Sequence, residues 1–382
     1  MLLRRITVAI LLVCCILLNG CSSNPSIENQ AYVLVMGVDT MPGDRIGLTI
    51  LIPKIGASGG ASQEDSGNKD ASYVIVSAEG DSYQSALEGL KWSATRELNL
   101  SQIKMIVFSE EISKKNAFKD VITTIAETYH LYTASRMVIC QGSANEFING
   151  HETVLGTRLF NELDAMFDHY SELGYIPVSN FADVYYAMQS IYSDPMTIWG
   201  FPSEQGETGA TQASAMIGSD SEMKALTKTP SSRHYLGAVV LKNGKYSDKL
   251  NAHQTLIANL LSGNLDSFNY EANGQTFQLT PLERPSVRIS FSGDKTDIII
   301  KMRLSAIAQN STFESNTVAP VIERDILETI RYCQNRSLEP FGFANKAALK
   351  VATIDEWFEM DWHNKYQNAD ISVNVHVMRS DS

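Results

Sequence analysis

The sequence has few cysteines, and they do not form the pattern of a disulfide-stabilised protein. Three lie in or beside an N-terminal apolar run and two in the body of the chain: Cys14, Cys15, Cys21, Cys140 and Cys333. Small disulfide-rich domains carry more cysteines at closer spacings. Cys140 ends an apolar stretch, and Cys333 continues a helical row of isoleucines. Both are therefore expected to be buried free thiols.

The chain also lacks a basic surface and a second long apolar run. Its 43 acidic residues exceed its 31 lysines and arginines, which gives a formal net charge of -12. An acidic body has no electrostatic reason to bind nucleic acid and offers no polybasic second membrane anchor. After the N-terminal run, no stretch approaches the roughly 20 apolar residues that a membrane-spanning helix needs.

Motifs of the common enzyme classes are missing or incomplete. The seven histidines are scattered, with no His-Glu-x-x-His and no close pair suited to catalytic zinc. Ser101 and Lys104 have the Ser-x-x-Lys spacing of acyl-enzymes, but they enter a predicted strand and lack the companion Ser-x-Asn and Lys-Thr-Gly elements. Residues 56–67 lack the lysine and the helix of a phosphate loop. No catalytic residue, metal ligand or cofactor site is predicted. Three polar residues of one predicted helix are expected to face solvent: Asp164, Asp168 and His169.

The clearest positive feature is a bacterial lipoprotein signal at the N-terminus. Arg4 and Arg5 precede an apolar run of about thirteen residues, which fits a signal-peptide core and is too short to span a bilayer. A small glycine before Cys21 suits cleavage at that bond. The prediction is a signal peptide over residues 1–20 and a lipidated Cys21, whose two acyl chains hold a membrane far more firmly than one. The alternative is an ordinary export signal with an incidental cysteine.

Strand-like and helix-like patterns alternate along the body and predict an α+β fold with two or more mixed α/β-layer domains. Residues 203–232 are rich in Ser, Thr, Gly, Ala and Glu and are predicted to be a linker or surface loop between domains at 21–202 and 233–382. Strands are predicted at 32–38, 45–52, 73–78, 103–108, 136–140, 235–241 and beyond a turn at Asn243-Gly244, then at 276–279, 287–291, 297–307 and 371–378. Helices are predicted after Asp81 with Gln84, around 118–126, at 158–172, at 181–192 capped by Ser179, at 252–261, and with Pro320 in a first turn.

Several segments, in this order, resemble one known family. A first strand ends in Gly37-x-Asp39, Glu79-Gly80-Asp81 precedes an amphipathic helix, and residues 99–111 read as a strand with an acidic turn. The second half adds residues 237–245, Pro340-Phe341-Gly342-Phe343, Trp357, Trp362 and a final alternating strand. Together with the lipoprotein signal, this order is similar to the Ger(x)C family, the lipoprotein subunits of nutrient germinant receptors in spore-forming bacteria. Ser22-Ser23 depart from the Trp-Asp that follows the lipid cysteine in many members.

The resemblance implies a non-enzymatic protein anchored through Cys21 on the outer face of the spore inner membrane. It implies two integral-membrane partners, the A-type and B-type receptor subunits, which this chain would scaffold or couple. The alternative is an extracytoplasmic solute-binding lipoprotein of a transporter, whose two lobes close over a ligand.

One aromatic cluster near the end of the first predicted domain is a candidate partner contact. Tyr185 and Tyr192 share a helical face with core residues, whereas Tyr186 and Trp199 are expected nearer an interdomain cleft. Exposed aromatic side chains make good interface anchors. Tyr186 and Trp199 are therefore predicted to contact a partner subunit.

Overall fold

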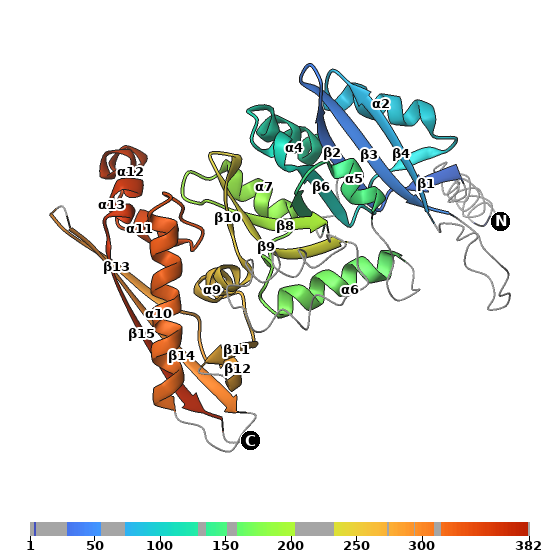
Figure 1. Ribbon diagram of the computed structural model, residues 1–382. Coiled ribbons are helices and arrows are strands. Elements are labelled where there is room, and N and C mark those ends of the chain that lie inside the picture. The colour runs from blue at the N-terminus through green and yellow to red at the C-terminus, as the bar shows by residue number, and fades with distance from the viewer. Residues whose placement is uncertain are drawn as a thin grey trace.

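The structure, a computed structural model, describes Arg4 and residues 29–54, 73–128, 135–150, 159–202, 233–272, 275–293, 295–308 and 315–380. Three sheets with packed helices make up this part of the chain (Figure 1). The predicted fold class of mixed sheets with packed helices is confirmed. No helix in the described ranges is long and apolar enough to cross a membrane.

The largest sheet has eight strands, and its four central strands are parallel. Its strands are β2 (Val35–Met41), β3 (Arg45–Pro53), β4 (Tyr73–Gly80), β6 (Met105–Ser109), β7 (Arg136–Cys140), β8 (Met196–Pro202), β9 (Arg233–Lys242) and β10 (Lys245–Leu250). Their order is β10-β9-β8-β7-β6-β2-β3-β4, with β2, β6, β7 and β8 parallel and the outer strands antiparallel. We call this sheet with its helices the first unit.

Helices cover both faces of the first unit, which explains why β6 is buried along its whole length. One face carries α2 (Tyr83–Ser93), α3 (Glu110–Ser113), α4 (Ala117–Thr128) and α7 (Phe181–Gln189), and the other carries α5 (Ala144–Asn149) and α6 (Leu159–Glu172). β1 (Gln30–Tyr32) and β5 (Glu97–Asn99) form a separate sheet of two short parallel strands.

Two predicted helix caps are wrong by one residue. The N-cap of α2 is Ser82, whose hydroxyl accepts a hydrogen bond from the backbone N–H of Ser85, whereas Asp81 forms an ion pair with Arg45. The N-cap of α7 is Asn180, because the Ser179 hydroxyl donates instead to a β8 carbonyl. Helix α7 also ends at Gln189, three residues earlier than predicted.

The second unit is built on a five-stranded sheet covered by one long helix. Its strands are β11 (Phe268–Ala272), β12 (Gln275–Pro281), β13 (Ser286–Ser292), β14 (Lys295–Ala308) and β15 (Asp370–Arg379), and its helices are α10 (Ser315–Gln334), α11 (Phe343–Ala348), α12 (Ile354–Met360) and α13 (Trp362–Gln367). β14 pairs with β13 and then β12 on one edge and with parallel β15 on the other. Pro320 lies inside α10, not in its first turn, because the helix begins earlier than the sequence pattern indicated.

The predicted hairpin at Asn243-Gly244 is confirmed, and both residues have positive φ angles, 51° and 74°. Its first strand, β9, pairs with β8, so the hairpin completes the sheet of the first unit. Residues 203–232 lie outside the described part of the chain. The division into domains at 21–202 and 233–382 stays a prediction, and the strand pairing crosses it.

One more helix, α9 (Ala252–Ser262), follows this hairpin directly. Figure 1 shows α9 between the β8–β9 side of the first unit and α10 of the second. The two units therefore pack against opposite sides of α9 (Figure 1).

Candidate functional site: the junction around α9

Helix α9 is buried on nearly all sides, as expected of a helix packed between two layers. At its N-terminus, Asn251 and Gln254 form a reciprocal capping box, and at its C-terminus Gly263 adopts the left-handed conformation. Its buried residues are Ala252, Thr255, Leu256, Ile257, Ala258, Asn259, Leu260 and Leu261. A helix with no solvent-facing stripe must find partners in both units.

One apolar cluster runs through α9 from the first unit to the second. It contains Val240 of β9, Leu256 and Leu260 of α9, Ile300 of β14 and Ile326 of α10. The polar side chain of Asn259 adds a tie to the first unit, because its amide donates to two carbonyls just before α7, those of Gly174 at 3.0 Å and Ile176 at 2.8 Å. The junction is therefore a packed core and not an open space between two lobes.

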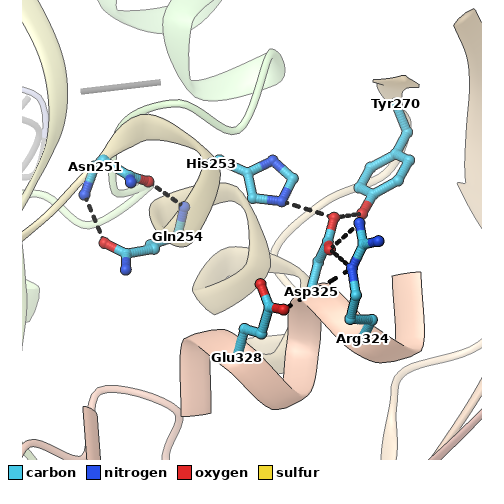
Figure 2. A network of polar contacts seen from close by, with 7 residues as sticks. All are labelled: Asn251, His253, Gln254, Tyr270, Arg324, Asp325 and Glu328. Carbon is cyan, nitrogen blue, oxygen red and sulfur yellow. Dashed lines mark hydrogen bonds and ion pairs between the residues drawn. The ribbon is translucent and has the colours of Figure 1, made fainter. Parts of the chain in front are cut away.

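A polar network clamps the N-terminal end of α9 to the second unit (Figure 2). Asp325 of α10 lies at its centre: its carboxylate is 3.1 Å from Nε2 of His253 on α9, and it accepts hydrogen bonds from the hydroxyl of Tyr270 on β11 and from Arg324 at 2.9 and 3.0 Å. Arg324 also approaches Glu328 at 4.0 Å. One carboxylate thus joins three elements.

The hydrogen bonds decide the charge of this carboxylate. Burial acts to raise the pKa of Asp325, but the hydrogen bonds from His253, Tyr270 and Arg324 outweigh it and lower the pKa below its usual value. Burial, with the hydrogen bond to Asp325, raises the pKa of Tyr270. At neutral pH the network therefore holds an ionised aspartate against a neutral tyrosine.

A His–Asp pair is also part of hydrolytic triads, in which the histidine must contact a nucleophile. Here Nε2 of His253 faces Asp325, and its ring lies 5.8 Å from the ring of Tyr270. Within the described residues, no serine, threonine or cysteine is hydrogen-bonded to His253. The geometry matches a structural clamp.

A second polar cluster lies where the loop after α7 meets the segment before α11. Backbone N–H of Glu339 donates to the Asp194 carboxylate at 2.9 Å, and the Glu339 carboxylate accepts from the N–H groups of Phe341, Phe343 and Ala344 at 2.9 to 3.1 Å. Glu339 is only 2% exposed. The two acidic residues fix the loop of one unit to that of the other.

Burial shifts the pKa values of the titratable groups in this cluster. It raises the pKa of Glu339 to about 8, helped by the charge of Asp194 and opposed by the three N–H groups. Burial also raises the pKa of Asp194, against the Glu339 N–H, His363 and Lys242. It lowers the pKa of His363, as does Lys242, whereas Asp194 and Asp361 oppose this. The pKa of Glu339 is thus shifted upward, whereas the pKa of Asp325 is shifted downward.

A groove runs beside this cluster, with a volume of about 400 Å³. Part of its lining comes from the first unit, from residues within 177–187 and 193–196, and the rest from α9 and the second unit, from residues within 259–264, 284–285 and 340–346. The groove is therefore a surface feature at which a small molecule would touch both units.

The structure treats the two aromatic residues predicted to contact a partner very differently. Tyr186 on α7 is 70% exposed, with its ring 5.3 Å from that of Tyr185. Trp199 is 2% exposed, because it lies in the apolar cluster between the sheet and helices α4 and α7, and its ring is covered by the Lys249 ammonium at 4.2 Å. As a surface anchor only Tyr186 remains, and Trp199 belongs to the core.

The two cysteines of the body and the Ser-x-x-Lys residues are buried or held by neighbouring side chains. Cys140 and Cys333 are buried free thiols, as predicted, and burial raises the pKa of both. Lys104 is nearly buried and forms an ion pair with Asp164 at 2.8 Å, whereas the Ser101 hydroxyl donates a hydrogen bond to the Asn99 side chain.

Cys21 lies outside the described residues. No group of histidine, cysteine and carboxylate side chains suited to a metal ion occurs in the ranges that the structure covers. Asp168 pairs with Arg136 at 3.5 Å, and His169 packs against Tyr170.

The Gly37-x-Asp39 motif also has a structural explanation. A Cβ at Gly37 would lie 2.7 Å from Cδ1 of Ile148 and 3.3 Å from Cβ of Ala144, so the lack of a side chain lets α5 pack closely on β2. The Asp39 carboxylate accepts from the N–H groups of Ala144 and Asn145 at 2.7 and 2.9 Å, which caps α5. The motif joins a strand to a helix.

The junction was not predicted from the sequence, although one signal was present. Glu339 is a lone charge in the apolar run from Leu338 to Phe341, and a charge in such a run indicates a buried, hydrogen-bonded group. Asp325 gives a similar signal on the apolar side of α10, directly before Ile326. Their partners are distant in sequence and could not be named.

Comparisons with known proteins agree along the chain. The family model described as "Spore germination protein N-terminal domain" matches residues 23–198, and "Spore germination B3/ GerAC like, C-terminal" matches residues 236–381. The putative spore germination protein YfkR of Bacillus subtilis (strain 168) is 21% identical over 380 residues, which cover 95% of this chain and 92% of the relative. The crystal structure of the GerBC protein has a similar fold, with a TM-score of 0.51 and 11% identity over 90% of this chain and 96% of that one.

Proposed function

The chain belongs to the GerAC-like family of spore germination proteins, and from this membership we propose that it is a lipid-anchored, non-enzymatic subunit of a spore nutrient germinant receptor. In this role it scaffolds or couples integral-membrane partners of the A and B type during germination. The observation that carries the proposal is the match of both family models, in order, to the two halves of the chain.

The packed junction supports a coupling role. Because a single apolar cluster runs from β9 through α9 to the second unit, a force applied to one unit is transmitted to the other. The clamps at Asp325 and Asp194 hold the same interface with hydrogen bonds. The polar side chains of both clamps are hydrogen-bonded to residues of the neighbouring unit or loop, which supports a structural coupling role over a catalytic one.

Membrane attachment is proposed to occur through Cys21. The signal pattern before it predicts cleavage after Gly20 and lipidation of the new N-terminal cysteine. A diacylglyceryl group is sufficient to anchor a protein of this size without a second signal. The proposed location is the extracytoplasmic face of the cell membrane, the inner membrane in the spore.

The rival function, a solute-binding lipoprotein, is supported by the groove at the junction. Its lining of residues from both units is what a ligand site between two lobes requires. Against this function, the buried α9 fills the space across which two lobes would close. The receptor role therefore remains the better account.

Gene deletion and complementation test the proposal. Deletion should abolish or slow the response of spores to a nutrient germinant, and the wild-type gene should restore it. A Cys21→Ala variant should lose membrane attachment and fail to complement, whereas the neighbouring Ser23→Ala variant should behave as wild type. Normal germination of the deletion strain together with loss of uptake of a solute would contradict the receptor role and support the rival.

Tyr186 is proposed as a contact to a partner subunit, since its ring is largely exposed on α7. Tyr186→Ala should reduce germination without changing the level of the lipoprotein in spore membranes. Asn374→Ala, at an exposed position of the second unit, is the matched control. Equal germination of both variants would exclude this contact.

A further inference from the structure

The described segment that starts at residue 29 lies at one end of the first unit, where it is tied to the segment after α2. Gln30 is paired with Glu97, the amide of Asn99 donates to the Gln30 side chain at 2.6 Å, and the Val33 N–H donates to the Asn99 carbonyl at 3.0 Å. Figure 1 shows β1, β4 and α2 grouped at this end of the unit. The chain therefore enters the fold beside the C-terminal end of α2.

This end carries the most exposed large apolar side chain of the described residues. Trp92, in the last turn of α2, is 87% exposed, and Val74, near the start of β4, is 43% exposed. Val76 and Ala78 of β4 pack on the face that α2 covers, and Val74 follows the same alternation. Because α2 runs back along β4, its last turn brings Trp92 toward Val74.

The predicted lipid anchor is close to this end in sequence. Cys21 precedes Gln30 by nine residues, a segment that spans at most roughly 30 Å when fully extended. Trp92 precedes Glu97, the partner of Gln30, by only five residues. Acyl chains on Cys21 thus keep Trp92 within reach of the bilayer surface.

We propose that Trp92 inserts into the headgroup region of the membrane to which Cys21 is anchored, and so sets the orientation of the first unit on the bilayer. Tryptophan is enriched at this depth because its ring is apolar and its N–H is polar. The charges beside it balance, since Lys91 is paired with Glu88 at 2.7 Å and exposed Arg96 is followed by exposed Glu97. The contact is therefore apolar and does not require anionic lipid. It rests on the lipid anchor of the proposed function.

Quenching of tryptophan fluorescence tests this contact. The lipidated full-length protein is reconstituted into phosphatidylcholine vesicles whose acyl chains are either normal or brominated. The other three tryptophans, Trp199, Trp357 and Trp362, are at most 6% exposed, so the emission lost in a Trp92→Phe variant reports on Trp92. Brominated lipid is expected to quench most of that emission and aqueous iodide little of it. Added phosphatidylglycerol should not change the result.

A double variant, Trp92→Phe with Leu349→Trp, is the matched control, because position 349 is 83% exposed at the end of α11 in the second unit. Its added emission should be quenched by iodide and not by brominated lipid. Trp92 emission that behaves in the same way, in protein that floats with the vesicles, would overturn the membrane contact and leave the anchor intact. Failure of the wild-type chain to float, or equal flotation of Cys21→Ala, would overturn the anchor and the contact together.

Discussion

The two units differ in how their sheets meet solvent. In the first unit, helices cover both faces, so strands such as β6 are buried at every residue. In the second unit, α10 covers one face, and β15 alternates between packed and exposed residues. The outer face of the second sheet presents polar side chains from three strands, among them Arg288, Lys301, Arg303, Asn374 and His376. The first unit is thus closed on both faces, whereas the second keeps one face free for solvent or a partner.

Truncation of a doubly covered strand should give the largest effect. Ile106 in β6 is fully buried between helices on both faces, and Ile106→Ala should lower the free energy of unfolding by about 2 to 5 kcal/mol because it leaves a cavity. Urea unfolding followed by circular dichroism measures this loss. A loss below about 1 kcal/mol would show that the first unit is less tightly packed than its burial implies.

The next effect depends on pH and concerns the loop between the units. The pKa of Glu339 is raised to about 8 in the folded protein, so the fold favours the protonated carboxyl. The stability that this preference contributes is fully present below the ordinary pKa of 4.5 and is lost as the pH rises toward 8. Between these two pKa values, Glu339 should lower the free energy of unfolding by up to about 1.4 kcal/mol for each pH unit.

Glu339→Gln should remove this term, which urea unfolding at several pH values between about 5 and 8 can measure. Asp194 adds a term of the same sign and His363 one of opposite sign, and both residues remain in the variant, so the difference between wild type and variant reports on Glu339 together with its interaction with Asp194. Parallel pH profiles for the two proteins would contradict the assignment.

Asp325 should respond to pH in the opposite sense. Its pKa is lowered in the fold, so its contribution is present above its ordinary pKa of 3.8 and disappears as the pH falls through the folded value. Asp325→Asn should cost about 1 to 3 kcal/mol at neutral pH and much less in acid, because the charge-assisted hydrogen bonds are lost. An equal cost at both pH values would argue for packing instead of charge.

The smallest effect is expected on the open face of the second sheet. Arg288→Ala should change the free energy of unfolding by no more than about 0.5 kcal/mol, since the side chain is exposed. Paired with Ile106→Ala, it gives the sharpest contrast between the units. A loss comparable to that of Ile106→Ala would mean that this face is not free.

Local patterns in the sequence predicted most strands and helices, because burial imposes a period of two on β15 and an unbroken apolar run on β6. The caps of α2 and α7 were misplaced by one residue, since adjacent polar residues compete for the same position. The junction was beyond reach for another reason: Asp194 and Glu339 are 145 residues apart, and nothing local encodes their meeting. The membership of β9 in the first sheet depends on a similar long-range pairing. Trp199 was misjudged because it belongs to an apolar cluster whose other members are distant in sequence, among them Phe118 of α4 and Val239 of β9.

The pairing of β9 with β8 also constrains how the protein is made. Until residues 233–250 have been synthesised and have paired, β8 is an edge strand with unpaired backbone groups, a state open to association with other chains. The nascent first half must therefore wait for a strand encoded after it, and a chain cut between the two family regions would keep that edge exposed. Completion of the first sheet is a late event in biogenesis, and it commits both halves to one folded product.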